Sequence, residues 1–186
     1  MGIPAYFSHI VRKHPGILRK IHKNHTIINN LLIDSNSVIY DAVRGIEYSG
    51  NSIVFESKLI KNICLKLEEY ITLISPTNEV IIAFDGVAPA AKLEQQRNRR
   101  YKTWFQKQLS AELDSTNEPV WDTTAITPGT TFMCNLANEV ATYFSNPDKF
   151  CVQSIIVSSS NEAGEGEHKL FEHVRKNIHN YKDQKT

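Results

Sequence analysis

The stretch VIIAFDGVAPAAKLEQQRNRR, residues 80–100, contains the two patterns from which the fold can be predicted. It begins with a short apolar run, Val80–Phe84, that ends at Asp85. A run of this length that is rich in β-branched residues is typical of a parallel strand covered on both faces. Pro89 and the two alanines after it indicate the start of a helix. A buried strand followed by a helix predicts an α/β fold.

The same strand-then-helix pattern recurs twice elsewhere. Apolar runs at Ile27–Ile33 and Ser154–Val157 resemble the first run, and each leads into polar residues. Helical spacing of apolar residues is found over Ile53–Leu73, after Thr127-Pro128 (expected N-cap and first-turn proline), and from Gly166 onward. Alternating strands and helices predict a doubly wound, mostly parallel sheet flanked by helices.

One segment and two tryptophans are placed by composition alone. Residues 110–126 are polar and rich in turn formers, so we expect a surface loop there. For Trp104 and Trp121 we expect core packing or the anchoring of a loop rather than stacking on a nucleobase.

Composition limits the class of protein. The 186 residues, 41% of them hydrophobic, predict one globular domain over 1–186. The net charge is only +1, so a nucleic-acid-binding surface has to come from local clustering of cations. No apolar run approaches the roughly 18 residues of a membrane span. Cys64, Cys134 and Cys151 form no Cys-x-x-Cys pair, which argues against a zinc site, and their odd number favours an intracellular setting.

Carboxylates follow all three predicted strands. Asp34 follows the first, Asp85 the second, and Glu165 and Glu167 lie in the turn after the third. The carboxyl ends of parallel strands meet at one edge of a sheet, so these side chains are expected to converge. Converging carboxylates repel one another unless a cation lies between them, and all-oxygen ligands favour Mg²⁺ or Mn²⁺. Two such ions would suit phosphodiester hydrolysis. Taken singly, each residue also fits a turn, a cap or a partner of a helix dipole.

A basic face follows directly after Asp85. Lys92, Gln96, Arg99 and Arg100 are spaced i, i+4, i+7 and i+8, which places them within roughly a 100° arc of a helix. Three cations and an amide on one face would suit a phosphate pocket, because arginine can bind phosphate with two hydrogen bonds. A charged helix face is more often simply solvated, but the short distance to Asp85 in the sequence favours phosphate binding here.

Five segments, in the same order, resemble motifs of the XRN 5′→3′ exoribonucleases. They are MGIPAYFSHIVRKHP (1–15), LLIDSNSVIYDAV (31–43), FDGVAPAAKLEQQRNRR (84–100), ITPGTTFM (126–133) and AGEGEHKL (163–170). The resemblance covers almost the whole chain. It implies a nuclease core of the kind found in PIN domains and flap endonucleases, and hydrolysis of 5′-monophosphorylated RNA from its 5′ end. The products would be nucleoside 5′-monophosphates, and the cofactor Mg²⁺ or Mn²⁺.

The resemblance also implies roles for ten residues. The divalent-metal ligands would be Asp34, Asp85, Glu165 and Glu167. The pocket for the 5′-phosphate would be formed by Lys92, Gln96, Arg99 and Arg100. Asn36 would support the site through hydrogen bonds. Tyr40 stands where the family usually has a histidine that stacks on the first base, and a tyrosine ring can also stack.

The chain also departs from the family pattern. Ala90 replaces a usual arginine and Ala163 a usual proline. Further metal-binding aspartates and a base-stacking tryptophan follow the GEGEH motif in the family but are not in this sequence, so we expect an incomplete metal site, which a second polypeptide could complete. Two alternatives stay open: a module that holds 5′-phosphorylated RNA without cutting it, and a DNA-directed flap-type nuclease. The QQRNRR and GEGEHK runs favour RNA. The family occurs in cytoplasm and nucleus, and we favour the cytoplasm.

Overall fold

The computed structural model describes residues 5–17, 27–113 and 120–182. Its strands are β1 (Asn30–Asp34), β2 (Glu79–Ala83) and β3 (Ser154–Ser158). Its α-helices are α1 (Tyr6–Lys13), α2 (Asn36–Arg44), α3 (Ser52–Ile74), α4 (Ala90–Leu113), α5 (Thr131–Tyr143), α6 (Gly166–Lys176) and α7 (Ile178–Tyr181). Short 3₁₀ turns are η1 (Pro15–Ile17), η2 (Thr123–Ala125) and η3 (Pro147–Phe150).

The three strands form one parallel sheet in the order β1-β2-β3. Their registers align Asp34 with Ala83 and Ala83 with Ser158, so all three carboxyl ends lie at the same edge. In the central strand β2, four of the five residues are buried. This burial on both faces explains why the strand reads as a continuous apolar run in the sequence.

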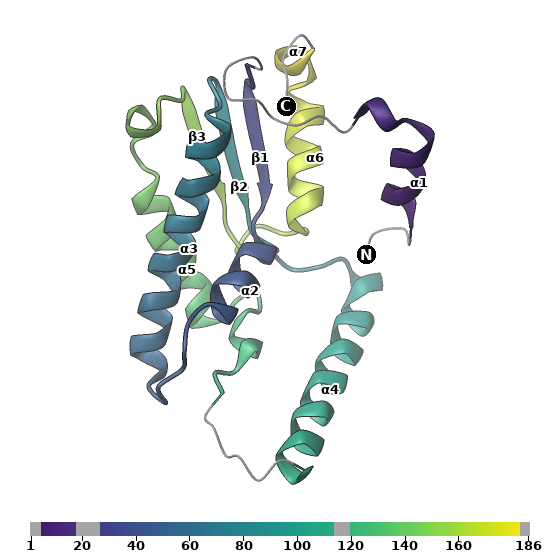
Figure 1. Cartoon of the computed structure of the whole chain (residues 1–186), viewed down its shortest axis with the longest axis vertical. Coiled ribbons are helices and arrows are strands. Elements are labelled where there is room, and N and C mark those ends of the chain that lie inside the picture. The colour runs from purple at the N-terminus through teal and green to yellow at the C-terminus, as the bar shows by residue number, and fades with distance from the viewer. Residues whose placement is uncertain (1–4, 18–26, 114–119, 183–186) are drawn as a thin grey trace.

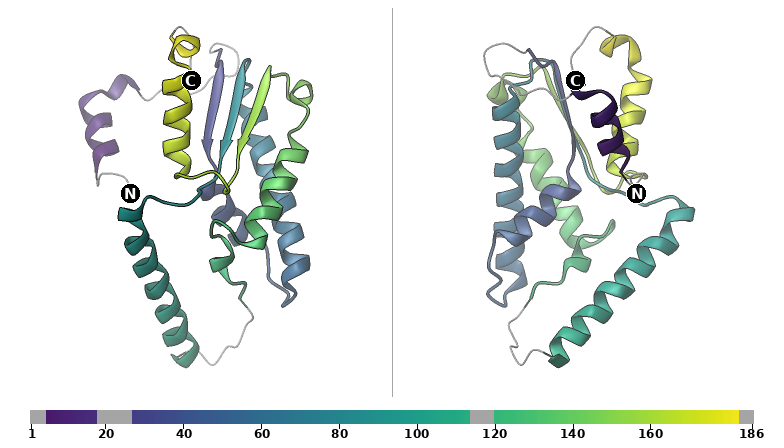
Figure 2. Two further views of the ribbon diagram at one scale, coloured as in Figure 1. Left: turned by 180° about the vertical axis from the view of Figure 1, so that it is seen from behind. Right: turned by 45° about the vertical axis from the view of Figure 1, so that its right-hand side comes forward.

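Helices cover both faces of the sheet. Helices α3 and α5 lie on one face, and α6 lies on the other against β1 and β2 (Figures 1 and 2). The core between the sheet and the first pair is closed by fully buried side chains, among them Leu59, Ile63, Leu67, Leu136 and Val140. The predicted doubly wound α/β fold is confirmed.

Helix α4 is arranged differently. It leaves the carboxyl edge of the sheet and extends away from the other helices (Figures 1 and 2). None of its described side chains is buried. Among the described residues, no helix is both long and apolar enough to cross a membrane.

The predicted elements agree with the structure with three exceptions. Strand β1 begins at Asn30 rather than Ile27, whose side chain is 69% exposed. The N-cap of α5 is Thr130, not Thr127: the Thr130 hydroxyl accepts a hydrogen bond from the amide of Met133 at 3.3 Å. Gly129, at φ 87°, makes the turn that delays the helix start.

The third exception is the predicted surface loop over residues 110–126. Helix α4 continues through Leu113, and residues 114–119 lie outside the described residues. Trp121 is buried in the core, with its ring centroid 5.2 Å from those of Phe55 and Phe132, as the expectation of core packing required. Trp104 does the opposite: its side chain is 57% exposed on α4, so the expected core packing is wrong for this residue.

Candidate active site

The four predicted carboxylates line one cavity at the carboxyl edge of the sheet. Asp34 ends β1, Asp85 follows β2, and Glu165 and Glu167 lie at the amino end of α6. The cavity has a volume of about 590 Å³. Its other wall comes from α4 and includes Lys92, Gln96 and Arg99. Residues from four separate segments of the chain therefore converge as predicted from the strand ends.

Asp85 is held by three hydrogen bonds from two other elements. Asn36, the first residue of α2, donates through Nδ2 to Asp85 Oδ2 at 2.7 Å and accepts from the Asp85 amide through Oδ1 at 3.1 Å. The amide of Gly166 donates to Asp85 Oδ1 at 2.7 Å. The first amides of a helix have no partner within the helix, so Asp85 serves as a cap for α6 supplied by another strand. These bonds fix the orientation of the carboxylate.

Two glycines permit the close approach of these segments. A Cβ atom on Gly166 would lie 2.5 Å from Asp34 Oδ1, so the backbone of α6 lies directly against that carboxylate. A Cβ atom on Gly86 would lie 1.7 Å from the carbonyl oxygen of Glu162. The Gly86 amide also donates to the carbonyl of Gly164 at 2.8 Å. A larger residue at Gly86 would push the loop after β3 away from the end of β2, and one at Gly166 would displace the Asp34 carboxylate from α6.

The side chain of Lys169 forms hydrogen bonds to the backbone just after both β2 and β3. Its ammonium donates to the carbonyl oxygens of Phe84 at 2.8 Å and Ser159 at 2.6 Å. Burial lowers the pKa of Lys169, and the nearby carboxylates of Glu162 and Asp85 oppose that shift. Because Phe84 precedes Asp85, and Ser159 opens the loop that leads to Glu165, this one side chain fixes the backbone behind three of the carboxylates. Sequence reasoning missed Lys169, although it lies in the quoted AGEGEHKL segment.

The charges of the cavity fit a divalent cation. Burial raises the pKa of Asp34, and the carboxylates of Asp85, Glu167 and Glu165 raise it further, while a hydrogen bond from the Asn36 backbone lowers it. The ammonium of Lys92 bonds to Glu165, and this bond raises the pKa of Lys92. A protein cation thus contacts one carboxylate of the cluster. The donor set is made of the carboxylate oxygens that Mg²⁺ and Mn²⁺ prefer.

A histidine extends this donor set. Oxygen atoms of Glu165 and Glu167 and a ring nitrogen of His168 all lie within 4.8 Å of one another. His168 Nδ1 is 3.6 Å from Glu165 Oε2. Sequence reasoning singled out the two glutamates and passed over the histidine next to them.

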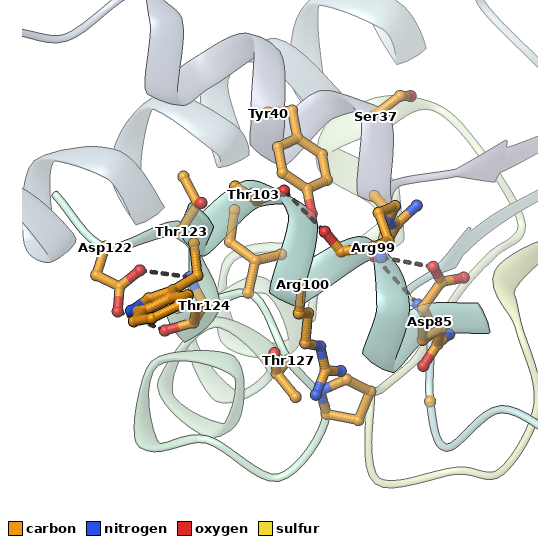
Figure 3. A pocket seen from close by; sticks show the side chains of 16 residues that line it. Ser37, Tyr40, Asp85, Arg99, Arg100, Thr103, Asp122, Thr123, Thr124 and Thr127 are labelled. Carbon is orange, nitrogen blue, oxygen red and sulfur yellow. Dashed lines mark hydrogen bonds between the residues drawn. The ribbon is translucent and has the colours of Figure 1, made fainter. Parts of the chain in front are cut away.

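A second cavity of about 490 Å³, shown in Figure 3, adjoins the first along α4. Asp85, Gln96 and Arg99 border both cavities, so the two lie next to each other. The remaining predicted site residues, Asn36, Tyr40 and Arg100, line the second one. Each of the ten predicted site residues therefore lines one of two adjoining cavities. The exposed Trp104 also lines this second cavity.

Known proteins are similar to this chain over almost its whole length. The family described as XRN 5′-3′ exonuclease N-terminus matches residues 1–186. The chain is 32% identical to 5′-3′ exoribonuclease 1 of Saccharomyces cerevisiae and of Homo sapiens, each over 94% of this chain but only 12% and 11% of those proteins. It is 30% identical to 5′-3′ exoribonuclease 2 of Candida albicans, over 94% of this chain and 22% of that protein.

The chain thus spans between about a tenth and a fifth of the length of these curated relatives. The match nevertheless extends over every segment that contributes to the two cavities. This chain belongs to the XRN 5′-3′ exonuclease N-terminal family.

Proposed function

We propose that this chain forms the 5′-end recognition site and the adjoining carboxylates of a divalent-metal-dependent 5′→3′ exoribonuclease. The substrate is 5′-monophosphorylated RNA, and the products are nucleoside 5′-monophosphates. The observation that supports this proposal is that the two adjoining cavities share Asp85, Gln96 and Arg99 as lining residues. A phosphate bound by Arg99 would therefore lie beside the carboxylates that hold the metal.

The carboxylates Asp34, Asp85, Glu165 and Glu167 would hold Mg²⁺ or Mn²⁺. When bound, such ions supply an activated water and a Lewis acid for the leaving oxygen. The chain's own contribution is to orient the ligands. Asn36 and the Gly166 amide fix both oxygens of Asp85, so the carboxylate does not have to reorganise when charge develops in the transition state.

The cations of α4 would bind the terminal phosphate. Arg99 and Arg100 can each donate two hydrogen bonds to phosphate oxygens, and Gln96 can donate one. Lys92 has a second task, because its ammonium bonds to Glu165 and links the phosphate-binding face of α4 to the carboxylates. Tyr40, which is 37% exposed at the wall of the second cavity, would stack on the first base.

A second candidate function is binding without cleavage. The observation in its favour is the bond between Lys92 and Glu165, through which a protein cation already neutralises one of the carboxylates. In that case the chain would hold a 5′-phosphorylated RNA end without cutting it, whereas in the enzymatic version a second polypeptide could complete the metal site. Both candidate functions imply an intracellular protein, and we favour the cytoplasm. The three free cysteines are consistent with a reducing compartment.

Incubation of the chain with labelled 5′-phosphorylated RNA in the presence and absence of Mg²⁺ separates these functions. We expect slow, Mg²⁺-dependent release of nucleoside 5′-monophosphates, no release from 5′-hydroxyl RNA, and little from DNA of the same sequence. The matched variant is Asp85→Asn, which removes the charge but keeps an acceptor for the Gly166 amide. Release that persists in this variant would contradict the proposal. Phosphate-dependent binding with no release would identify the binding module.

A further inference from the structure

Helix α4 has a second face, opposite the cations that line the two cavities. This face has large apolar side chains that are each 41–58% exposed, namely Leu93, Tyr101, Trp104, Phe105 and Leu109. At 100° per residue, Tyr101 and Phe105 lie roughly 160° from the middle of the basic face. Because α4 extends away from the other helices (Figures 1 and 2), these side chains stay exposed in the part of the chain that the structure describes.

Four of these side chains form one row along the helix, which we call the apolar ridge. Leu93, Tyr101, Phe105 and Leu109 are spaced by four or eight residues, and Arg97 stands between the first two. Rows of side chains four residues apart are the ridges through which helices most often pack on one another. At 1.5 Å per residue, the row is roughly 24 Å long. The Arg97 guanidinium lies over the Tyr101 ring, 5.6 Å from its centre. The ridge therefore has the form of one half of a helix–helix contact.

The composition of the apolar ridge favours a protein partner over a nucleic acid. Aromatic residues and arginine are enriched in the cores of protein interfaces and dominate their binding energy. The leucines at the two ends of the ridge offer no flat surface on which a base could stack. The cations that would bind phosphate lie on the other face of α4, toward the cavities. A contiguous exposed apolar row of this kind marks a site of protein contact.

Charge decides which kind of helix fits the apolar ridge. From Lys92 to Lys102, α4 has five cations and one acidic residue. Arg97 lies within the ridge, and Lys102 directly follows Tyr101. A second copy of α4 would bring the same cations against these, and like charges across an interface oppose association. A helix whose apolar side chains are bordered by glutamate or aspartate would pair with the cations instead. The charge of α4 thus favours an acidic partner over a second copy of this chain.

We propose that the apolar ridge of α4 is a docking surface for an amphipathic helix with acidic borders, presented by a second polypeptide. The partner helix packs its apolar side chains against Tyr101, Phe105 and Leu109, and its carboxylates pair with Arg97 and Lys102. This contact needs neither RNA nor metal, so it can be tested separately from the proposed nuclease function. Because the other face of α4 lines both cavities, a polypeptide held on the ridge would lie next to the candidate active site.

Synthetic helical peptides of about 20 residues, long enough to span the ridge, test this proposal. They share leucines at helical spacing and differ only in the residues that border the leucines, which are either glutamate or lysine. In calorimetric titrations of the full chain at low salt, the glutamate peptide should bind at least about ten-fold more tightly than the lysine peptide. This difference should shrink at about 1 M salt, where charges are screened over roughly 3 Å. A glutamate peptide of the same composition but scrambled order should not bind, because its leucines no longer share one face.

Two matched phenylalanines locate the contact. Phe105→Ala should weaken binding of the glutamate peptide at least about ten-fold, as expected for an aromatic anchor at an interface. Phe171→Ala on α6, whose side chain is 62% exposed, should leave the peptide affinity unchanged. Both positions are exposed, so the melting temperatures of the two variants should equal that of the unchanged chain.

The other outcomes would each overturn the proposal. If the glutamate and lysine peptides bound equally, the partner would not be acidic, and if neither bound, the ridge would not be a docking surface for a helix. Sedimentation velocity of the unchanged chain should show a monomer. A dimer that is lost in Phe105→Ala would assign the ridge to a second copy. Phe105→Ala should also leave the affinity for 5′-phosphorylated RNA unchanged, and a loss of RNA binding would assign the ridge to nucleic acid.

Discussion

Helices α4 and α6 both begin at the candidate active site, but they are attached to it in opposite ways. The amino end of α6 is bonded to the sheet through backbone and buried groups, namely the Gly166 amide and the Lys169 ammonium. Helix α4 has no buried side chain among its described residues, and the ion pair between Lys92 and Glu165 links it to the start of α6. The difference fits the proposed function, in which fixed groups would orient the carboxylates and an exposed helix would present cations to an RNA strand that has to enter and leave.

The largest difference between the two helices should appear in stability. Lys169→Met removes two hydrogen bonds from a partly buried ammonium and leaves the carbonyls of Phe84 and Ser159 without that donor. We expect a loss of about 2 kcal/mol in the free energy of unfolding, measured by urea denaturation. The matched variant on α4 is Lys102→Met, at an exposed position, which should change stability by less than about 0.5 kcal/mol. Equal losses would show that α4 is attached as firmly as α6.

Substitution of Asp34 is expected to change stability less than substitution of Lys169, and to raise it rather than lower it. Its pKa is raised, so ionised Asp34 opposes folding at neutral pH, and this cost disappears as the pH falls through the folded-state pKa. Without divalent metal, Asp34→Asn should raise the melting temperature at pH 7 by only about 1–2 °C, because solvent reaches part of the side chain and screens its charge. The gain should shrink toward pH 4.

Addition of Mg²⁺ completes the test of Asp34. The metal should stabilise the unchanged chain more than Asp34→Asn, because a ligand that binds only the folded state raises its melting temperature. Thermal unfolding with and without Mg²⁺ measures both effects. The assignment of Asp34 to a metal site with repelling carboxylates would be contradicted if Asp34→Asn were less stable than the unchanged chain without metal. It would also be contradicted if Mg²⁺ stabilised both equally.

The sequence predicted the fold well where one face or both faces of an element are buried. Val80–Phe84 is apolar because β2 is covered on both faces. The end of this apolar run marked the end of the strand, and so predicted that Asp85 lies at the carboxyl edge of the sheet. The extent of α4 was not predictable in the same way, because a helix with no buried face has no apolar period to mark its end. The N-cap of α5 was misplaced because Thr127 and Thr130 both suit a cap, and only the turn at Gly129 decides between them.

Within the site, sequence reasoning identified charged groups by their position after strands but not the groups that hold them. Lys169 appears in the sequence as one more cation on an amphipathic helix, and its burial follows from tertiary packing. The close approach of a neighbouring carbonyl to Gly86 and of a carboxylate to Gly166 was not predicted, because it depends on how the segments pack. Trp104 was assigned to packing because most tryptophans are buried, and its exposure depends on the direction in which α4 extends.

The most direct test of the account measures the affinity of the chain for one RNA oligonucleotide with either a 5′-monophosphate or a 5′-hydroxyl end. The titration is done at fixed salt with EDTA present, so that nothing is cleaved. We expect the phosphorylated RNA to bind about 10- to 100-fold more tightly, the range for charge-assisted hydrogen bonds to one phosphate. The preference should collapse in Arg99→Gln, which lines both cavities, and persist in Arg97→Gln, whose guanidinium lies over Tyr101 instead. Equal affinity for the two RNA ends in the unchanged chain would contradict the account.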